Sequence, residues 1–420
     1  MTTDPKGLVD HLFRERSGQM VAWLTRVFGA AYLDLVEEVV QDALLKALQQ
    51  WPYSGVPSNP AGWLCQVARN GALDVLRRDS AFRSRAPAIA AELTRSTPGT
   101  MNESADPVFE DDELKMIFLC CHPALPMDTR VALSLKTVSG FSVQEIGRAF
   151  LTSDATIAQR LVRAKRRLRE LDVPFDLPSA EDLSPRLDAV LEVIYLLFNE
   201  GYASRGGDEL VRADLCFEAL RLARLVARSA RTESPAAHAL AALIALQAAR
   251  RRARLDDRGE IVLLEEQDRS RWDAGLTALG FAHLERSAAG SVMTAYHVQA
   301  AIAAAHTSAS SPADTPWRDI LRLYDDLAVL NPSPLVRLNR IVAVWKVHGS
   351  EAALTDLRPL EAEPALQSYY LLPALKGRLL ASIGDQGAAR HAFEMALALP
   401  CSEPEQRFLE KQLKELGARS

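Results

Sequence analysis

Residues 140–170 read GFSVQEIGRAFLTSDATIAQRLVRAKRRLRE, and this stretch predicts two helices joined by a tight turn. Ser142, with Glu145 three residues later, has the spacing of a capping box. Such a box opens a short helix, which we expect over about 143–150. Leu151 then belongs to the turn, although many helix-turn-helix motifs place glycine there.

The second helix of this stretch is expected over about 154–171, with Ser153 as its N-cap. Its core face recurs at helical spacing and consists of Ile157, Leu161, Ala164 and Leu168. Its outer face offers Thr156, Gln159, Arg160, Arg163 and Arg167. The pattern predicts a helix-turn-helix in which Ser153 and the N-terminal half approach base edges while the basic half meets phosphates. The alternative is an ordinary helix with a solvated basic face.

The positive charge of this stretch is local. The whole chain of 420 residues has a net charge of −5, yet residues 151–170 hold six basic and two acidic side chains. We therefore expect a polyanionic partner to be met at one place. Hydrophobic residues make up 48% of the chain, which is typical of a globular protein. The rarity of alternating β-branched runs favours an all-α fold, and the length favours two to four domains.

The compartment is indicated by cysteine usage and hydropathy. Five cysteines without a repeated CxxC pair suit a reducing cytoplasm better than a disulfide framework. The first residues lack the apolar stretch of a signal peptide, and no run of about 18 apolar residues predicts a membrane span. We therefore expect a cytoplasmic protein that does not contact membranes.

Two further helices are predicted upstream. Residues 33–50 read LDLVEEVVQDALLKALQQ, with an apolar stripe of Leu35, Val39, Ala43 and Ala47. We expect the polar side chains Glu37, Glu38, Gln41 and Asp42 to lie outside that stripe. Residues 61–79 read AGWLCQVARNGALDVLRRD, a basic helix that begins with a tryptophan. A plain helical bundle of mixed charge is the alternative interpretation.

The series EEVVQDALLKAL, WLCQVARNGALDVLRR and the helix-turn-helix resembles the extracytoplasmic-function (ECF) sigma factors of bacterial RNA polymerase. The resemblance covers about residues 5–172. Its most specific part is the pattern WLxxxARNxxxDxxRR, matched by Trp63, Leu64, Ala68, Arg69, Asn70, Asp74, Arg77 and Arg78. It implies a first domain that binds the polymerase clamp and melts the promoter −10 element. It also implies a second domain whose helix-turn-helix reads the −35 element.

The resemblance also implies roles for individual residues. Polymerase binding maps onto Glu38, Gln41 and Asp42 of the acidic helix. Contacts to the −10 element map onto Trp63, Arg69, Asn70, Arg77 and Arg78, and the loop 51–60 would form a pocket for a flipped base. Trp63 fits a core position equally well. Contacts to the −35 element map onto Ser153, Thr156, Gln159, Arg160, Arg163 and Arg167.

Composition divides the chain into four parts. We expect sigma domains over 1–80 and 113–172, a flexible linker over 81–112 rich in Ala, Ser, Thr, Pro and acidic residues, and a C-terminal helical domain over 173–420. The acidic run 110–113 would enter a basic channel of the polymerase or begin a helix. In CCHPALP, 120–126, the adjacent Cys120, Cys121 and His122 are poorly spaced for one metal ion and favour a buried helix end.

The C-terminal part resembles a helical solenoid. Cap-proline pairs at 184–185, 234–235, 315–316 and 333–334 predict helix starts. PALKGRLLASIGDQGAARHAFEMALALP looks like a tetratricopeptide repeat, with small and aromatic residues at Gly377, Ala389, Phe393 and Ala396. With CCHPAL, FNEGY at 198–202, RRRARLDDRGEIVLLEEQDRSRW at 250–272, YHVQAAIAAAH at 296–306 and SPLVRLNRIVAV at 333–344, the chain resembles the ECF group that carries a tetratricopeptide-like C-terminal extension. That resemblance implies an extension that takes part in activity or its control.

An enzyme is a weaker interpretation. Several acidic and histidine side chains are available, namely Glu200, Glu265, Glu266, Asp268, His297 and His306. Yet the sequence has no phosphate loop, nucleophile elbow or HExxH motif. Glu265 and Glu266, followed by Arg269 and Arg271, predict a charge network along one helix. The basic run 250–254 predicts a solvated face or, less simply, a contact to nucleic acid.

We therefore expect a transcription initiation factor without catalytic chemistry, cofactor or metal. Its expected partners are core RNA polymerase, promoter DNA, and a protein or ligand of the C-terminal helical domain. The alternatives are a helix-turn-helix regulator fused to a protein-binding solenoid, or a solenoid scaffold or enzyme. The acidic helix and the WLCQVARN segment favour the sigma factor, because a simple regulator does not need them.

Overall fold

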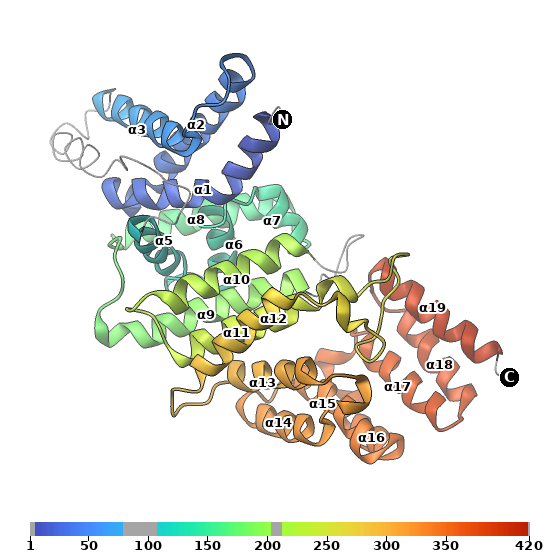
Figure 1. Ribbon diagram of the computed structural model, residues 1–420. Coiled ribbons are helices and arrows are strands. Elements are labelled where there is room, and N and C mark those ends of the chain that lie inside the picture. Colours follow the sequence, from blue (N-terminus) through green and yellow to red (C-terminus); the bar gives the residue numbers. More distant parts are fainter. Residues whose placement is uncertain (1–4, 79–106, 203–211, 419–420) are drawn as a thin grey trace. The chain divides into compact units, whose positions relative to one another are not determined.

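The computed structural model describes residues 5–78, 107–202 and 212–418, and over these ranges every named element is a helix (Figure 1). Side chains are described from Ser17 to Val75, from Phe109 to Tyr202 and from Arg212 to Gly417. The one β-type pairing in this part of the chain is an isolated bridge between Leu255 and Ile261. The predicted all-α fold is confirmed.

The chain divides into two compact units, residues 1–196 and 197–420. The helices of the N-terminal unit are α1 (Pro5–Phe28), α2 (Leu33–Ser54), α3 (Pro60–Arg78), α5 (Pro107–Cys120), α6 (Met127–Thr137), α7 (Val143–Ala149), α8 (Asp154–Glu170) and the first part of α9 (Ala180–Tyr202). A short 3-10 turn, η1 (Ala30–Tyr32), joins α1 to α2.

Helix α1 organises the N-terminal unit, because it packs on both α2 and α5. Its residues 20–25 are all buried, including the fully enclosed Trp23, as expected for a helix covered on every side. A Cβ on Gly18 would lie 1.8 Å from the carbonyl oxygen of Val138, just after α6. Only glycine therefore permits this approach. Arg26 closes the α1–α5 contact with an ion pair to the buried Asp112 at 2.8 Å.

The C-terminal unit continues with α10 (Ala213–Arg228), α11 (Pro235–Ala249), α12 (Ala274–Ser287), α13 (Ala295–Ser308), α14 (Trp317–Leu330), α15 (Pro334–His348), α16 (Ser350–Leu357), α17 (Leu371–Ser382), α18 (Gln386–Leu397) and α19 (Glu403–Ala418). Five 3-10 turns lie between them: η3 (Arg251–Ala253), η4 (Arg269–Arg271), η5 (Pro312–Asp314), η6 (Arg358–Ala362) and η7 (Pro364–Leu366). The alanine-rich α11 is almost wholly buried among α10, α12 and α13.

From α13 to α19 each helix packs on the next one in the chain. In α17 a Cβ on Gly377 would lie 3.0 Å from the ring of Phe393 in α18, so the absence of a side chain lets the two helices come close. Ala389, Phe393 and Ala396 are buried together there, as the repeat pattern predicts. Serial packing of this kind is the arrangement of a solenoid. The tetratricopeptide-like character of the array stays a prediction.

Helix boundaries confirm some of the predicted starts and correct others. α11 and α15 begin at Pro235 and Pro334, each capped by the preceding serine. The start predicted at 184–185 is wrong: α9 begins at Ala180 and runs through Pro185, because Ser179 caps it by accepting from the Asp182 N–H at 3.3 Å. The third cap-proline pair is displaced by one residue, since α14 begins at Trp317.

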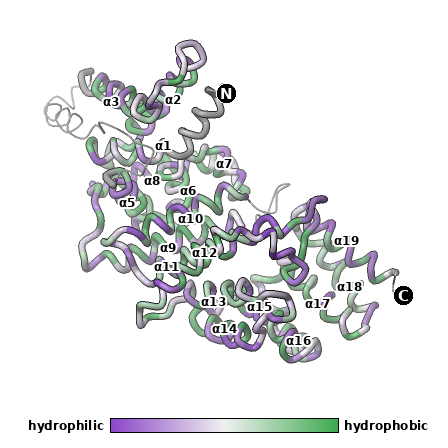
Figure 2. Tube along the Cα trace, in the orientation of Figure 1, coloured by the Kyte–Doolittle hydropathy of each residue, from purple (hydrophilic) through white to green (hydrophobic). Residues whose placement is uncertain are grey.

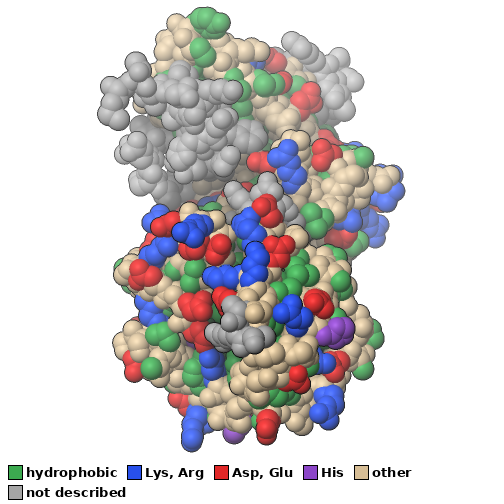
Figure 3. Space-filling view, turned by 90° about the vertical axis from the view of Figure 1, so that its right-hand side faces the viewer, with side chains coloured by type: hydrophobic (Ala, Val, Ile, Leu, Met, Phe, Trp, Pro, Cys, Tyr) green, Lys and Arg blue, Asp and Glu red, His purple; other side chains and the backbone are tan. Residues whose placement is uncertain are grey.

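The expected linker also ends earlier than predicted. α5 begins at Pro107, so the acidic run 110–113 is helical, and Asp112 and Glu113 are buried. Most helices carry both hydrophilic and hydrophobic residues (Figure 2). On the face shown in Figure 3, cationic and anionic side chains are interspersed without a large area of one sign.

Candidate polymerase and DNA surfaces

Helices α7 and α8 form the predicted pair around a tight turn. Ser142 accepts from the Glu145 N–H at 3.1 Å, and the Glu145 carboxylate accepts from the Ser142 N–H at 2.8 Å, which completes the capping box. α7 ends with Leu151 at φ 49°, in the left-handed region, and the Thr152 N–H bonds to the Gly147 carbonyl at 2.9 Å. This is a Schellman ending in which leucine holds the position that glycine usually takes.

Helix α8 presents three faces. The predicted core face is confirmed, since Ile157, Leu161, Ala164 and Leu168 are buried. A second face carries Lys165 and Arg169 toward the segment that contains η1 and α2. The third face carries the predicted DNA-binding residues and lies across the helix from the second, because 100° per residue separates the two groups by about half a turn.

The six residues predicted for the −35 element differ in their surroundings. Ser153 caps α8 by accepting from the Thr156 N–H at 3.3 Å, and the two hydroxyls are 2.8 Å apart. Arg160 is half-buried and pairs with Asp128 of α6 at 3.2 Å. Gln159, Arg163 and Arg167 are exposed, with Arg167 lying 3.7 Å from Glu170. The cationic half of the face is therefore open to solvent.

Helix α3 turns its Trp63 and Asn70 side chains to one side. Trp63 is half-buried and stands edge-on to the fully buried Trp51, with ring centroids 5.5 Å apart. Asn70 is exposed and accepts from Gln66 at 3.1 Å, and Arg69 donates to the same Gln66 at 3.5 Å. The side chains of Arg77 and Arg78 lie outside the described part of the chain.

The connection between α2 and α3 is shorter than the predicted loop 51–60. α2 continues through Pro52 to Ser54, and α3 begins at Pro60, so only residues 55–59 are not helical. Gly55 reverses the chain at φ 81°, and Asn59 caps α3 by accepting from the Gly62 N–H at 2.9 Å. Tyr53 at the end of α2 is 92% exposed, which leaves an aromatic ring in water beside this loop.

The polar face of α2 is partly as predicted. Glu38, Gln41 and Asp42 are all exposed. Glu37 is not outside the apolar stripe, because its side chain is buried. The buried row of α2 includes Leu33, Val36, Val40 and Leu44, and helical spacing places Glu37 within that row. The sequence did contain a signal for this burial. An acidic residue within a row of apolar residues needs a hydrogen-bonding or charged partner.

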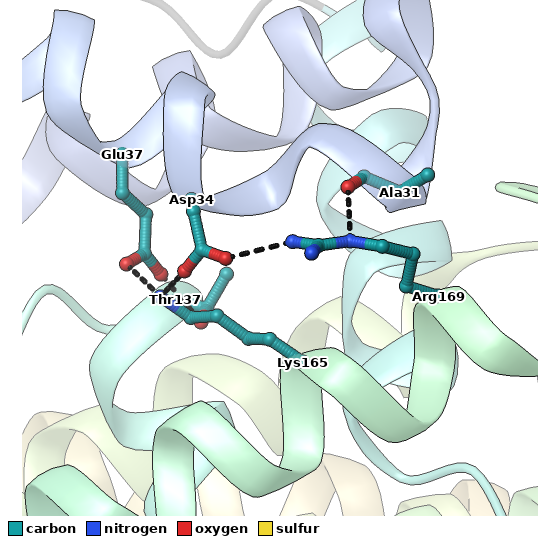
Figure 4. A network of polar contacts seen from close by, with 6 residues as sticks. All are labelled: Ala31, Asp34, Glu37, Thr137, Lys165 and Arg169. Carbon is teal, nitrogen blue, oxygen red and sulfur yellow. Dashed lines mark hydrogen bonds and ion pairs between the residues drawn. The ribbon is translucent and has the colours of Figure 1, made fainter.

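Lys165 of α8 is that partner (Figure 4). Its Nζ donates to Glu37 at 2.6 Å and to Asp34 at 3.0 Å, and Thr137 donates to the other Glu37 oxygen at 3.1 Å. Arg169 donates to Asp34 at 2.9 Å and to the Ala31 carbonyl at 3.0 Å. We call these six residues the α2–α8 network.

Charge in the α2–α8 network is matched, with two carboxylates facing two cations. Burial works against the charged form of Lys165, but Glu37 and then Asp34 outweigh it and raise the pKa of Lys165. Sequence reasoning missed this contact, because the paired residues are more than 120 positions apart in the chain.

The buried cysteines near this region are structural. α5 ends at Cys120, and both Cys120 and Cys121 are buried, which confirms the predicted buried helix end. Burial raises the pKa of Cys121 to about 12, so this thiol stays protonated near neutral pH.

Across the described residues, no helix combines the length and apolarity that a membrane span requires.

Three family models match three different parts of the chain. Sigma-70 region 2 matches residues 12–82, and Sigma-70 region 4 matches residues 115–168. A family of unknown function, DUF6596, matches residues 186–288. No solved structure matches the chain.

Relatives among curated proteins agree with these matches. An uncharacterized protein of Rhizobium meliloti is 42% identical over 98% of this chain and 96% of its own length. The ECF RNA polymerase sigma factor EcfG of Rhodopseudomonas palustris is 32% identical over 38% of this chain and 82% of its own length. The ECF RNA polymerase sigma-E factor of Escherichia coli K12 is 31% identical over 31% of this chain and 70% of its own length. With regions 2 and 4 in order and such relatives, the chain belongs to the ECF sigma factors of RNA polymerase and carries a C-terminal helical extension.

Proposed function

We propose that this sigma factor binds core RNA polymerase through Glu38, Gln41 and Asp42 on α2. The observation that carries the proposal is that these three polar side chains are exposed while the other side of the same helix is buried in region 2. An exposed acidic face on a rigid helix can meet a basic surface without first unfolding. Region 2 thereby anchors the factor, and the polymerase supplies the chemistry of RNA synthesis.

Promoter recognition is assigned to α3 and α8. The face of α3 with Trp63, Arg69 and Asn70 offers an aromatic ring, a cation and an amide to an unstacked strand, and Arg77 and Arg78 extend the same basic helix. The outer face of α8 offers Gln159, Arg160 and Arg163 to base edges and Arg167 to the backbone, with Ser153 and Thr156 at its N-terminus.

Simultaneous recognition of both promoter elements requires region 2 and region 4 to separate. Elements at −10 and −35 lie about 25 base pairs apart, which is about 85 Å along B-DNA at 3.4 Å per pair. In the N-terminal unit, α2 and α8 are in direct contact through the α2–α8 network. We propose that polymerase binding opens this network. Oppositely charged side chains at a surface can exchange each other for water or for a new protein surface at little cost.

The first test is the double variant Glu38→Lys with Asp42→Lys. It should abolish co-elution with core polymerase, because it reverses two charges one helical turn apart on an exposed face. The matched control is Asp188→Lys with Glu192→Lys, which makes the same change at the same spacing on two exposed positions of α9. Circular dichroism should show an unchanged helical content in both. Co-elution of the α2 variant at the wild-type level would refute the polymerase assignment.

The C-terminal helical part is proposed to control the activity of the sigma regions. In support, the first turns of α9 belong to the N-terminal unit, where Arg186 donates to the Phe118 carbonyl of α5 at 2.7 Å. We expect a chain that ends after Tyr202, which keeps α9, to differ from the full chain several-fold in promoter-directed transcription. Equal run-off transcription by both chains would remove the control function from the extension.

A further inference from the structure

A cavity of about 500 Å³ lies within the C-terminal unit. Its walls come from α14 and α15, from residues 263–269, from the segment around η5, and from one side chain each of α13 and α17. Such a volume is within the range of sites that hold small organic molecules. The N-terminal unit offers a contrast, because a cavity of about 20 Å³ beside Glu37 and Thr137 has room for little more than water.

Part of the cavity wall is aromatic and apolar. Trp317 at the start of α14, Tyr324 two turns further and Val342 of α15 all line it. Trp317 is fixed by the ring of His306, which meets it edge-on with centroids 5.3 Å apart. Burial raises the pKa of Tyr324 to about 12, so its hydroxyl stays neutral near pH 7. This wall suits a flat apolar body.

The charged part of the wall has an excess of cations. Arg269, Lys346 and Arg378 line the cavity, and Glu265 is the one carboxylate among its lining residues. Burial and the neighbouring Arg250 and Arg269 lower the pKa of His306 to about 4, so this imidazole is neutral near pH 7. Among the lining residues the cations therefore outnumber the carboxylate by two, and Asp314, which does not line the cavity, offsets part of the charge of Arg269.

The cations are held in place before any ligand arrives. Glu265 accepts from Lys346 and, at 2.9 Å, from Arg378. The charged groups of Lys346 and Arg378 each lie 5.1 Å from the centre of the Trp345 ring. Each cation uses one of its several N–H donors on Glu265, so further donors are left for a second acceptor.

Arg269 is fixed from the other side. It donates to the carbonyls of His306 at 2.8 Å and Ala309 at 2.5 Å, and it lies 4.8 Å from the centre of the Trp272 ring. Its Nε is buried and has no hydrogen-bond partner among the described residues. A buried N–H without an acceptor is costly, and it adds to the cost of holding this guanidinium in place. Arg269 also lines the cavity, so part of its side chain is available to an anion there.

We propose that this cavity is a binding site for a small organic anion with a flat aromatic body, that is, an aromatic carboxylate. The carboxylate would lie among Arg269, Lys346 and Arg378, and the ring would pack on Trp317 and Val342. The proposal is independent of promoter recognition, because every named group belongs to the C-terminal unit.

The test is calorimetric titration of the full chain with 2-naphthoate and with its neutral analogue 2-naphthamide. We expect one site per chain with a Kd of about 1 mM or tighter for the carboxylate, a value that follows from the ligand efficiency of drug-like molecules. The amide should bind at least tenfold more weakly, since it cannot use the unmatched cations. Absence of saturation by 2-naphthoate, or equal affinity for both compounds, would overturn the proposal.

Two variants locate the site. Arg378→Met should weaken 2-naphthoate binding at least fivefold, whereas Lys376→Met should leave it unchanged. Lys376 is the matched control because it lies on the same helix and pairs with Glu361 outside the cavity. If Arg378→Met fails to fold, Lys346→Gln serves in its place. Wild-type affinity in a folded cavity variant would place the binding elsewhere and refute the assignment.

Discussion

Two clusters of charge, one in each unit, differ in how their charges are matched. In the α2–α8 network, two cations face two carboxylates across two helices, beside a cavity of only about 20 Å³. In the C-terminal cavity, three cations face one carboxylate beside about 500 Å³ of space. A cluster with matched charges holds two parts of a chain together, whereas a cluster with an excess of one charge beside an empty cavity has the capacity to bind a further anion.

The outer face of α8 belongs to the second kind. Arg160, Arg163 and Arg167 lie on it. Among the described residues only two acids, Asp128 and Glu170, are near them, so the face has an excess of positive charge. One helix therefore carries a face with matched charges toward α2 and an outer face with an excess of positive charge.

Lys165→Met should break the matched cluster. It leaves the buried Glu37 without its cation, so the free energy of unfolding of the N-terminal unit should fall by about 3–5 kcal/mol. Urea unfolding of the full chain, followed by hydrogen exchange in α2 and α8, measures this. Adding Glu37→Leu to Lys165→Met should recover most of the loss, since no buried charge then lacks a partner. Wild-type exchange rates in α2 of the single variant would contradict the prediction.

Acid and alkali should act on different units. His283 and His238 are buried with their Nδ1 atoms 2.8 Å apart, and burial, then His238 and nearby arginines, lower the pKa of His283 to about 4. The unfolded chain takes up this proton near pH 6.5, so it binds more protons than the folded chain between pH 6.5 and 4. The C-terminal unit should therefore lose about 2–3 kcal/mol of stability over that range.

The raised pKa of Lys165 has the opposite consequence. Its contribution is fully present below the pKa of an unfolded lysine, near 10.4, and is lost as the pH rises through the folded value. Acid should thus weaken the C-terminal unit first and alkali the α2–α8 network first. Hydrogen exchange at pH 4.5, 7 and 10.5 distinguishes the two. In His283→Leu, the acid loss should shrink; an undiminished loss would assign it to other groups.

Arg160 and Arg167 should separate two kinds of DNA contact. Arg160→Ala should cost about 1–3 kcal/mol in promoter binding and relax sequence preference at one position. Arg167→Ala should weaken binding across sequences and lower the salt slope by about one. Binding by the polymerase holoenzyme to a set of promoter variants measures both. Equal losses on all promoters for both variants would contradict the division of roles.

Glu265→Gln should increase the affinity of the C-terminal cavity for an anion. It removes the one carboxylate that lines the cavity, so 2-naphthoate should bind about tenfold more tightly, or by about 1.4 kcal/mol. The adjacent Glu266→Gln is the control, because Glu266 is exposed and does not line the cavity. Weaker binding by the Glu265 variant would mean that this carboxylate positions the cations more than it competes with the anion.

Local patterns predicted the helix-turn-helix well. The capping box at Ser142, the N-cap at Ser153 and the core face of α8 all depend on spacings of three or four residues. Such spacings bring side chains together within one helical turn, so they can be recognised in the sequence alone. The same reason explains why Gly377 and Phe393 could be matched from the repeat pattern. Glu38, Gln41 and Asp42 were correctly expected to be exposed.

Contacts between distant residues were not accessible to such patterns. The charges around Glu265 were expected to pair along one helix with Arg269 and Arg271, but that segment is not a continuous helix, and Glu265 pairs with Lys346 and Arg378. The basic run 250–254 was expected to be solvated, yet Arg254 lies on the ring of Tyr202 and Arg251 on that of Phe217.

The sequence by itself determined the all-α fold, the order of the two sigma regions, the core face of α8 and the exposure of Glu38, Gln41 and Asp42 on α2. The buried face of α2 was only partly predicted, because Leu35 is not fully buried while Val36 and Val40 are. Tertiary structure alone decided that Glu37 meets Lys165 and that three cations gather around one cavity. The physical reason is range: helix formation and capping act over one or two turns, whereas the partner of a buried charge is chosen by packing between helices that chain position does not specify.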